Sequence, residues 1–175
     1  MILPLDASTL PHVRHVTRFM RDADRCEIFA TRWTEDTDEL AGAVVAAARL
    51  GAVVTDTPTG APVAVIVAAN PWPNVWSVGL FATDYWRAIA LSAVRWIRRV
   101  LMPELWRHGA LRVECHSLAD HYEAHALLRH LGRTHEQRVP CMGKGGEDFI
   151  RFAWIRSQFE ATHVFHVARF ERAAA

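Results

Sequence analysis

The sequence predicts a single α/β domain whose mixed, mostly antiparallel central sheet is flanked by helices. Helical patterns occupy the first 50 residues, three strand-like segments joined by turns follow, and helices then alternate with strands as far as residue 156. Strands joined by short turns pair antiparallel, whereas a helix between two strands is typical of a parallel crossover. We therefore expect one domain over residues 1–156 and an extension over residues 157–175.

The composition favours a globular domain and argues against several other classes of protein. The chain has 175 residues, of which 51% are hydrophobic, so a core can form without disulfides. Its formal net charge of +1 gives no electrostatic basis for binding nucleic acid or an anionic membrane. Cys26, Cys115 and Cys141 lack a CxxC spacing, which favours reduced thiols. No secretion signal is visible, and the most apolar stretch, residues 41–54, is too short to span a bilayer.

Capping residues and apolar spacing predict the first helices. Asp6 or Ser8 can cap a helix because the oxygen of either side chain can accept a hydrogen bond from a free backbone amide. Four apolar residues are expected along one side of this helix: Val13, Val16, Phe19 and Met20. Residues 24–33 form a second, short helical or turn segment in this prediction.

A third helix and three strands are predicted next. Asp36 or Asp38 caps the helix, which is expected to continue through Leu50 and to end at Gly51. Runs of valine, isoleucine and aromatic residues, separated by proline- and glycine-containing turns, then predict strands. These strands cover residues 51–56, 63–70 and 75–83.

The rest of the chain is predicted to alternate between helices and strands. A long helix covers residues 87–108, and Pro103 should kink or break it because proline lacks a backbone donor. A second helix covers residues 120–132, with Asp120 as its cap and Gly132 at its end. Three further strands are expected at residues 111–117, 134–140 and 148–156.

The junction between strand and helix at residues 78–94 has the sequence VGLFATDYWRAIALSAV. Together with the element order, it resembles the GNAT superfamily of N-acetyltransferases over most of the chain. The local likeness is to GNAT-like proteins of bacteriophages, including internal virion proteins of short-tailed phages. It rests on an aromatic strand end, the Trp86-Arg87 pair, a long helix containing Met102, and a later helix that ends in Leu-Gly.

The resemblance implies a site for acetyl-CoA at this junction. Six residues match the family's R-G-x-G-x-G run, which meets the diphosphate: Arg87, Ala88, Ile89, Ala90, Leu91 and Ser92. Leu80 and Ala82 of the preceding strand would contact the pantetheine arm. Ala88, Ala90 and Ser92 stand where glycines are usual, and a left-handed backbone at a non-glycine residue costs about 1–2 kcal/mol. The resemblance therefore implies a degenerate acetyl-CoA site.

The positions that carry chemistry in the family also differ. Leu128 stands where many members have a tyrosine that protonates the leaving thiolate, and His121 stands near an asparagine that contacts the cofactor. Residues 75–82 contain no acidic residue to deprotonate an amine. If the chain is active, Tyr122 and Glu114 are the candidates for moving the proton.

Other titratable residues give weaker signals. His121 and His125 lie four residues apart on a predicted helix, but no third ligand accompanies them, so we expect no metal site. Cys115 and His116, near a strand end, fit either the acetyl-CoA cleft or the ordinary core.

Two hypotheses of different class follow. The first is a degenerate GNAT-like protein of phage type, with a virion-associated or interaction role and no expected cofactor. It would contact other protein chains, virion components among them, through four apolar residues of its extension, and would occupy the host cytoplasm or the virion. These residues are Val164, Phe165, Val167 and Phe170.

The second hypothesis is an active, acetyl-CoA-dependent N-acetyltransferase. An open split between residues 78–82 and 111–115 would favour this enzyme, whereas a split filled by side chains would favour the scaffold. A regulator that binds a small ligand in the same cleft is a third alternative.

Overall fold

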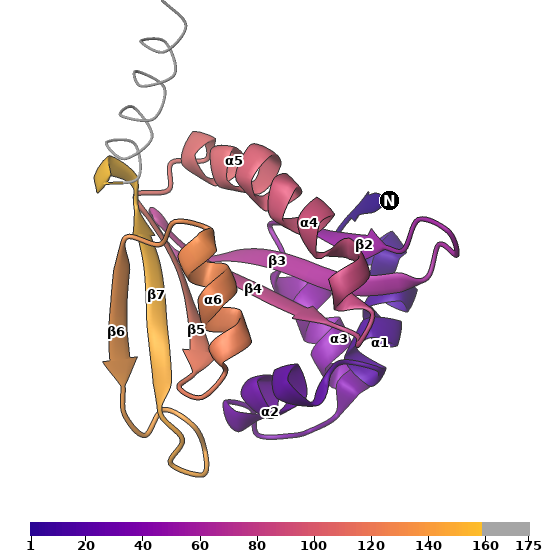
Figure 1. Ribbon diagram of the computed structural model, residues 1–175, viewed down its shortest axis with the longest axis horizontal. Coiled ribbons are helices and arrows are strands. Elements are labelled where there is room, and N and C mark those ends of the chain that lie inside the picture. The colour runs from indigo at the N-terminus through magenta and orange to yellow at the C-terminus, as the bar shows by residue number, and fades with distance from the viewer. Residues whose placement is uncertain (159–175) are drawn as a thin grey trace, which may run out of the picture.

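The computed structural model describes residues 1–158 and contains a seven-stranded sheet with helices on both faces (Figure 1). The strands are β1 (Ile2–Pro4), β2 (Leu50–Thr55), β3 (Pro62–Trp72), β4 (Val75–Ala82), β5 (Arg112–Leu118), β6 (His135–Val139) and β7 (Phe149–Ile155). The helical elements are η1 (Ala7–Thr9), α1 (Leu10–Arg18), α2 (Asp22–Ala30), α3 (Thr37–Ala47), α4 (Trp86–Trp96), η2 (Ile97–Leu101), α5 (Met102–Arg107) and α6 (Tyr122–His130). The four apolar residues of the extension, Val164, Phe165, Val167 and Phe170, lie outside the described residues.

The sheet has the strand order β1-β2-β3-β4-β5-β7-β6. Every neighbouring pair is antiparallel except β4 and β5, which are parallel. This arrangement confirms the predicted mixed, mostly antiparallel sheet. Strand β1 was not among the predicted strands.

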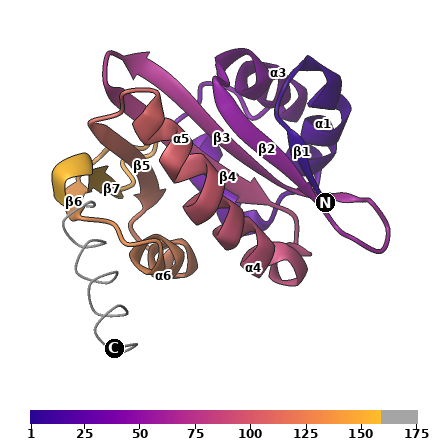
Figure 2. The ribbon, with the colours of Figure 1, turned by 90° about the horizontal axis from the view of Figure 1, so that it is seen from above.

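Two helical layers cover the sheet, as the view in Figure 2 shows. The larger hydrophobic core lies between the sheet and the layer formed by α4, η2, α5 and α6. A smaller core lies under α1 and α3, where Val13 and Val16 are fully buried against β2, β3 and β4. No helix within residues 1–158 is long and apolar enough to cross a lipid bilayer.

The start of the chain follows the capping prediction with one exception. The carboxylate of Asp6 accepts a hydrogen bond from the Ser8 amide at 2.8 Å, which caps η1 directly before α1. Phe19 and Met20 were expected along one side of the first helix, but both follow the end of α1, where Phe19 is 57% exposed and Met20 is buried. The prediction for Phe19 is wrong because the helical spacing ends at Arg18.

Gly51 does not end the third helix, so that prediction is also wrong. Helix α3 is capped by Asp36, ends at Ala47, and is followed by strand β2, which contains Gly51. A Cβ atom at Gly51 would lie 2.4 Å from the carbonyl oxygen of Ile66 on β3. The glycine is therefore required by the close approach of two strands.

The long helix predicted for residues 87–108 is continuous but irregular. Its middle, η2, is a π-helical turn in which the Met102 amide donates to the Ile97 carbonyl. Pro103 lies in the first turn of α5, directly after this wide turn. Because the turn is widened there, the missing proline donor is accommodated without a break in the chain direction.

Asp120 does not cap the last helix, contrary to the prediction. Helix α6 begins at Tyr122, and the N-cap position is held by His121, whose side chain makes no capping hydrogen bond. Gly132, with φ of 79°, follows the helix end as expected. The cap prediction failed because the helix starts two residues later, and the His121 ring bonds to Glu27 of α2 instead.

Two glycine substitutions test the close approach at β2. We expect Gly51→Ala to lower the free energy of unfolding by about 2–3 kcal/mol, because its methyl group would overlap the Ile66 carbonyl. Gly42 lies in α3, and an added Cβ atom there would meet no other atom within 4 Å. Gly42→Ala should therefore raise the free energy of unfolding by about 0.5–1 kcal/mol. Urea denaturation of both variants measures the difference, and equal stability of the two would contradict a steric requirement at Gly51.

Candidate functional site

The candidate site is a split between β4 and β5. These two strands pair only through Val75 with Arg112, Trp76 with Val113, and Ser77 with Glu114. Beyond these pairs the strands diverge, and their carboxyl ends lie apart in Figure 1. A cavity of about 360 Å³ occupies the split.

The walls of this cavity come from both sides of the split. Helix α2 bounds one end, whereas η2 and α6 supply most of the apolar wall. The apolar lining includes Ile97, Leu101, Met102, Leu127 and Leu131. Leu80 and Leu128, two positions singled out from the sequence, also line the cavity.

The backbone of β4 faces the cavity at alternate residues. The Thr83 amide donates to the Val63 carbonyl of β3, whereas the Ala82 amide points away from β3 and donates to Asp24 Oδ2 at 2.7 Å. Alternate residues of an antiparallel strand direct their backbone groups to the same side. Val78 and Leu80 therefore direct their N–H and C=O groups into the split.

Ala82 differs from Leu80 because its backbone is already bonded within the chain. Its amide is held by Asp24, and its carbonyl accepts from the Arg21 amide at 2.9 Å. The resemblance implies that Leu80 and Ala82 contact the pantetheine arm. Leu80 is the one of these two residues whose backbone groups face the cavity without hydrogen bonds to Asp24 and Arg21.

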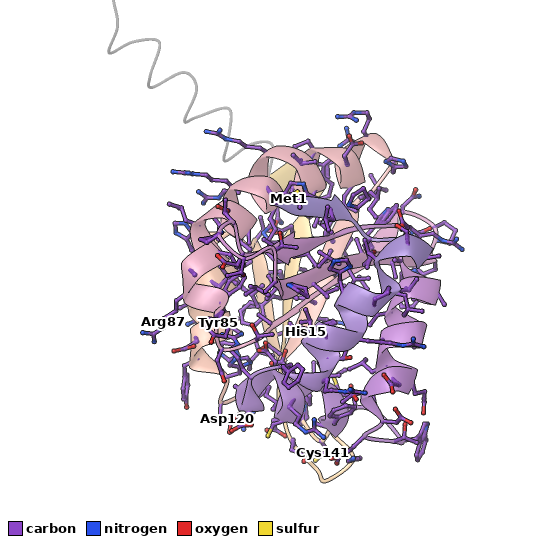
Figure 3. The ribbon with its side chains drawn as sticks, turned by 90° about the vertical axis from the view of Figure 1, so that its right-hand side faces the viewer. Met1, His15, Tyr85, Arg87, Asp120 and Cys141 are labelled. Atoms are coloured by element: carbon purple, nitrogen blue, oxygen red, sulfur yellow. The ribbon has the colours of Figure 1, made fainter. Side chains whose placement is uncertain are left out.

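The residues of the expected diphosphate loop lie in the first turns of α4, which begins at Trp86. In a helix that starts there, the amides of Ala90, Leu91 and Ser92 donate to carbonyls one turn earlier. Arg87 extends outward (Figure 3), is 91% exposed, and lies 3.6 Å from Glu123. The expected loop is therefore a regular helix start, in which the Trp86 amide donates to the Thr83 carbonyl and the Ala88 amide donates to the Tyr85 carbonyl.

A polar cluster forms the end of the cavity nearest α2. Glu27 Oε2 accepts hydrogen bonds from Ser117 Oγ at 2.6 Å, from the Leu118 amide at 2.8 Å, and from His121 Nδ1 at 2.9 Å. The hydrogen bond to Glu27 raises the pKa of His121 above its ordinary value. Asp24 is almost fully buried, and burial raises the pKa of its carboxyl, although Arg21 and the Ala82 amide oppose the shift.

Sequence reasoning missed Asp24 and Glu27. Both lie in α2, for which only a short helical or turn segment was predicted. The available signal was their spacing of three residues, which places two carboxylates on one helix face. Carboxylates with this spacing are common on exposed helices, so the spacing alone did not identify Asp24 and Glu27 as residues of the site.

Two neighbouring residues of β5, Cys115 and His116, line the same cavity. Burial raises the pKa of the Cys115 thiol, which therefore stays protonated and is a poor nucleophile. Burial lowers the pKa of His116, so its imidazole is neutral near pH 7 and can accept a proton. The structure thus places both residues at the cleft, and Cys115 also belongs to the core.

Tyr122 and Glu114, the proton carriers considered from the sequence, are not among the residues that line the cavity. Tyr122 is 73% exposed, and Glu114 pairs with Arg112.

His125 Nε2 lies 2.8 Å from the Leu118 carbonyl. Within residues 1–158, no group of three or more His, Cys, Asp or Glu side chains is placed to hold a metal ion.

Comparison with solved structures identifies the fold. The ribosomal-protein-S18-alanine N-acetyltransferase from Escherichia coli has a TM-score of 0.64 and 20% identity, over 89% of this chain and 92% of its own. The ribosomal-protein-S5-alanine acetyltransferase from Vibrio fischeri has a TM-score of 0.66 and 13% identity, over 90% and 93% of the two chains. A GNAT-family acetyltransferase from Bacillus anthracis has a TM-score of 0.62 and 14% identity, over 88% and 93%.

These structures show that the chain has the fold of the GNAT acetyltransferases, as expected from the resemblance. No model of a known protein family matches the sequence, and no curated protein matches it.

The two histidines of the cleft should titrate in opposite directions from the ordinary value of about 6.5. We expect an NMR titration to place His121 above this value and His116 below it. A raised pKa in the folded state means that protonated His121 contributes stability below about pH 6.5, which is lost as the pH rises through the folded value. A lowered pKa means that His116 disfavours folding as the pH falls from about 6.5 through its folded value. Similar pKa values for both residues would contradict the contrast between a carboxylate-bonded His121 and a desolvated His116.

Proposed function

We propose that the chain is an N-acetyltransferase that binds acetyl-CoA in the split between β4 and β5 and acetylates a primary amine. The observation that carries this proposal is the open cavity between two strands that stop pairing after Ser77 and Glu114. An open split is the feature that separates the enzyme hypothesis from the scaffold hypothesis. The GNAT fold supports the same conclusion.

The cleft fits the thioester and pantetheine end of acetyl-CoA. The pantetheine arm contains amide groups, and the backbone groups of Val78 and Leu80 that face the split can pair with them as a neighbouring strand would. The apolar wall around Leu101 and Leu127 excludes water from this end. When bound, acetyl-CoA supplies the activated acetyl group.

The outer end of acetyl-CoA would lie at the start of α4. The positive end of the helix dipole favours an anion there, although the Trp86 and Ala88 amides already donate to carbonyls of this chain. Trp86 also lines the cavity on this side. Arg87, Ala88, Ile89, Ala90, Leu91 and Ser92 are the proposed contacts for this part of the molecule. A helix start without glycine presents fewer backbone amides to a ligand than a glycine loop does. We therefore expect the chain to bind the diphosphate more weakly than the pantetheine.

His116 is the proposed acceptor of the proton that leaves the amine. It lines the cavity, and its lowered pKa keeps the imidazole neutral at physiological pH. Tyr122 and Glu114 would then act only through water, because neither lines the cavity.

Filling the cleft should abolish binding of the acyl donor. Ala124 of α6 lines the cavity, whereas Ala126 of the same helix is exposed and does not. We expect wild type and Ala126→Phe to bind acetyl-CoA with micromolar affinity in isothermal titration, and Ala124→Phe to lose at least about tenfold in affinity, because its ring would occupy the pantetheine volume. Thiol release with a panel of primary amines then measures transfer. Absence of binding by the wild type would refute the proposed function.

Restoring an acid at position 128 tests the chemistry separately. Leu128 lines the cavity where related enzymes carry a tyrosine, so Leu128→Tyr supplies a group that can protonate the leaving thiolate. We expect kcat to rise about tenfold or more, with little change in acetyl-CoA affinity, and Leu128→Phe to give no such rise. An equal effect of both variants would point to packing instead of proton transfer.

A second candidate function is a non-catalytic interaction protein of phage type, found in the host cytoplasm or in virions. It is favoured by the regular helix over Trp86–Trp96, where the glycines of a diphosphate loop are absent. In that case residues 157–175 would contact other protein chains, virion components among them. The absence of acetyl-CoA binding, together with recovery of the chain in purified phage particles, would support this alternative.

A further inference from the structure

We propose that Asp24 and Glu27 form a strut that holds the carboxyl ends of β4 and β5 apart, with His121 joining the two carboxylates, and that this strut sets the width of the cleft. The ligand-binding consequence rests on the proposed function, whereas the strut itself does not.

The β4 side of the strut is held by Asp24. Its carboxylate accepts the Ala82 amide at 2.7 Å and is oriented by a bidentate contact with Arg21, whose Nη2 lies 2.7 Å from Oδ1 and whose Nε lies 3.1 Å from Oδ2. Asp24 is only 3% exposed, so these contacts are shielded from water. The guanidinium of Arg21 also lies over the Trp86 ring, with 5.8 Å between its Cζ atom and the ring centroid.

The β5 side of the strut is held by Glu27. Its Oε2 atom accepts the Leu118 amide at 2.8 Å and the Ser117 hydroxyl at 2.6 Å. The next amide along the chain, that of Ala119, donates to the Asp148 carbonyl directly before β7. The Leu118 amide therefore faces away from β7 and toward the split.

Continuing the register of the Ser77–Glu114 pair would place Ala82 only one residue beyond Leu118, so the two amides lie at nearly the same height on the facing edges of the split. A continuous parallel ladder would pair these edges with each other at a separation of about 4.8 Å. Each edge is instead capped by a carboxylate from α2, which lies between the ends of β4 and β5 in Figure 1. Closing the split would take the Ala82 amide from Asp24 and the Leu118 amide from Glu27, and the loss of a donor is unfavourable for a carboxylate as buried as Asp24.

His121 connects the two sides. Its Nδ1 lies 2.9 Å from Glu27 Oε2, and its Nε2 lies 3.9 Å from Asp24 Oδ1. Nε2 is buried without a hydrogen-bond partner, and the Asp24 carboxylate lies within ion-pair distance of it. An imidazolium here compensates two carboxylates, whereas a neutral ring leaves Asp24 facing a lone pair.

The charged and titratable groups around His121 come from three elements. They are Asp24 and Glu27 of α2, Arg21 before α2, and Glu123 and His125 of α6, with the Ser117 hydroxyl on β5. Arg21 lies 3.8 Å from Glu123, so its charge is shared between α2 and α6. Loss of the His121 proton should therefore loosen the strut as the pH rises.

Amide hydrogen exchange tests the strut without any ligand. We expect Glu27→Ala to reduce protection of the Leu118 amide, and Asp24→Ala that of the Ala82 amide, by about tenfold or more each, while Val65 in the core stays protected. Exposed Glu35→Ala and Asp22→Ala are the matched controls and should change neither amide. Where an alanine variant does not fold, Glu27→Gln and Asp24→Asn replace it. These keep an acceptor oxygen, so part of the protection should be retained, while the pKa of His121 should fall.

Calorimetry with coenzyme A at pH 5.5 to 8 tests the effect on the cleft. We expect Glu27→Ala to lower the affinity about tenfold or more, and Glu27→Gln to restore most of it while removing the part of the pH dependence that follows His121 titration. Unchanged exchange at both amides would overturn the strut, and so would an affinity within twofold of wild type for Glu27→Ala. If the wild type binds no coenzyme A, the proposed function fails, and the exchange experiment alone decides the strut.

Discussion

The structure depends on how backbone N–H and C=O groups are satisfied where β4 and β5 stop pairing. Buried amides need partners, and two strands that separate inside a sheet lose the ones they would give each other. At the ends of the two strands, side chains of α2 take over this role. Between those ends and the last strand pair, Val78 and Leu80 face an open space instead. The same constraint therefore explains both the buried charges and the cavity beside them.

The inner and outer ends of the proposed acetyl-CoA site differ in how well they suit the part of the ligand that each would bind. The inner end has a strand edge, an apolar wall and a neutral histidine in one cavity. The outer end has a helix that begins at Trp86, and the Arg87 side chain is largely exposed and lies near Glu123. Recognition would thus rest on the pantetheine and thioester, and the affinity for the diphosphate is the quantity in which this chain should differ most from relatives with a glycine loop.

The sequence was sufficient for the fold and insufficient for the polar part of the site. Alternating strands, glycine-containing turns and the strand–helix junction predicted the order of the elements apart from β1, because these signals are local. Gly51 was misassigned because its requirement comes from Ile66 on another strand. Glu27 was missed because its partners, Ser117, Leu118 and His121, lie about 90 residues away in the sequence. No local pattern of residues in a single sequence indicates a contact between side chains that are so far apart along the chain.

The π-helical turn η2 changes the rotational phase of the helix that contains it. One extra residue in a turn rotates everything after it by about 100° relative to a regular helix. Because of that rotation, Leu105, which follows the turn, stays on the side of the helix that carries Ile97, and both residues belong to the larger hydrophobic core. A regular α-helix of the same sequence, without the wide turn, would instead rotate Leu105 away from this side by about 100°. The wide turn therefore keeps one apolar side along the whole helix, from the cleft wall at Ile97 to the buried core at Leu105.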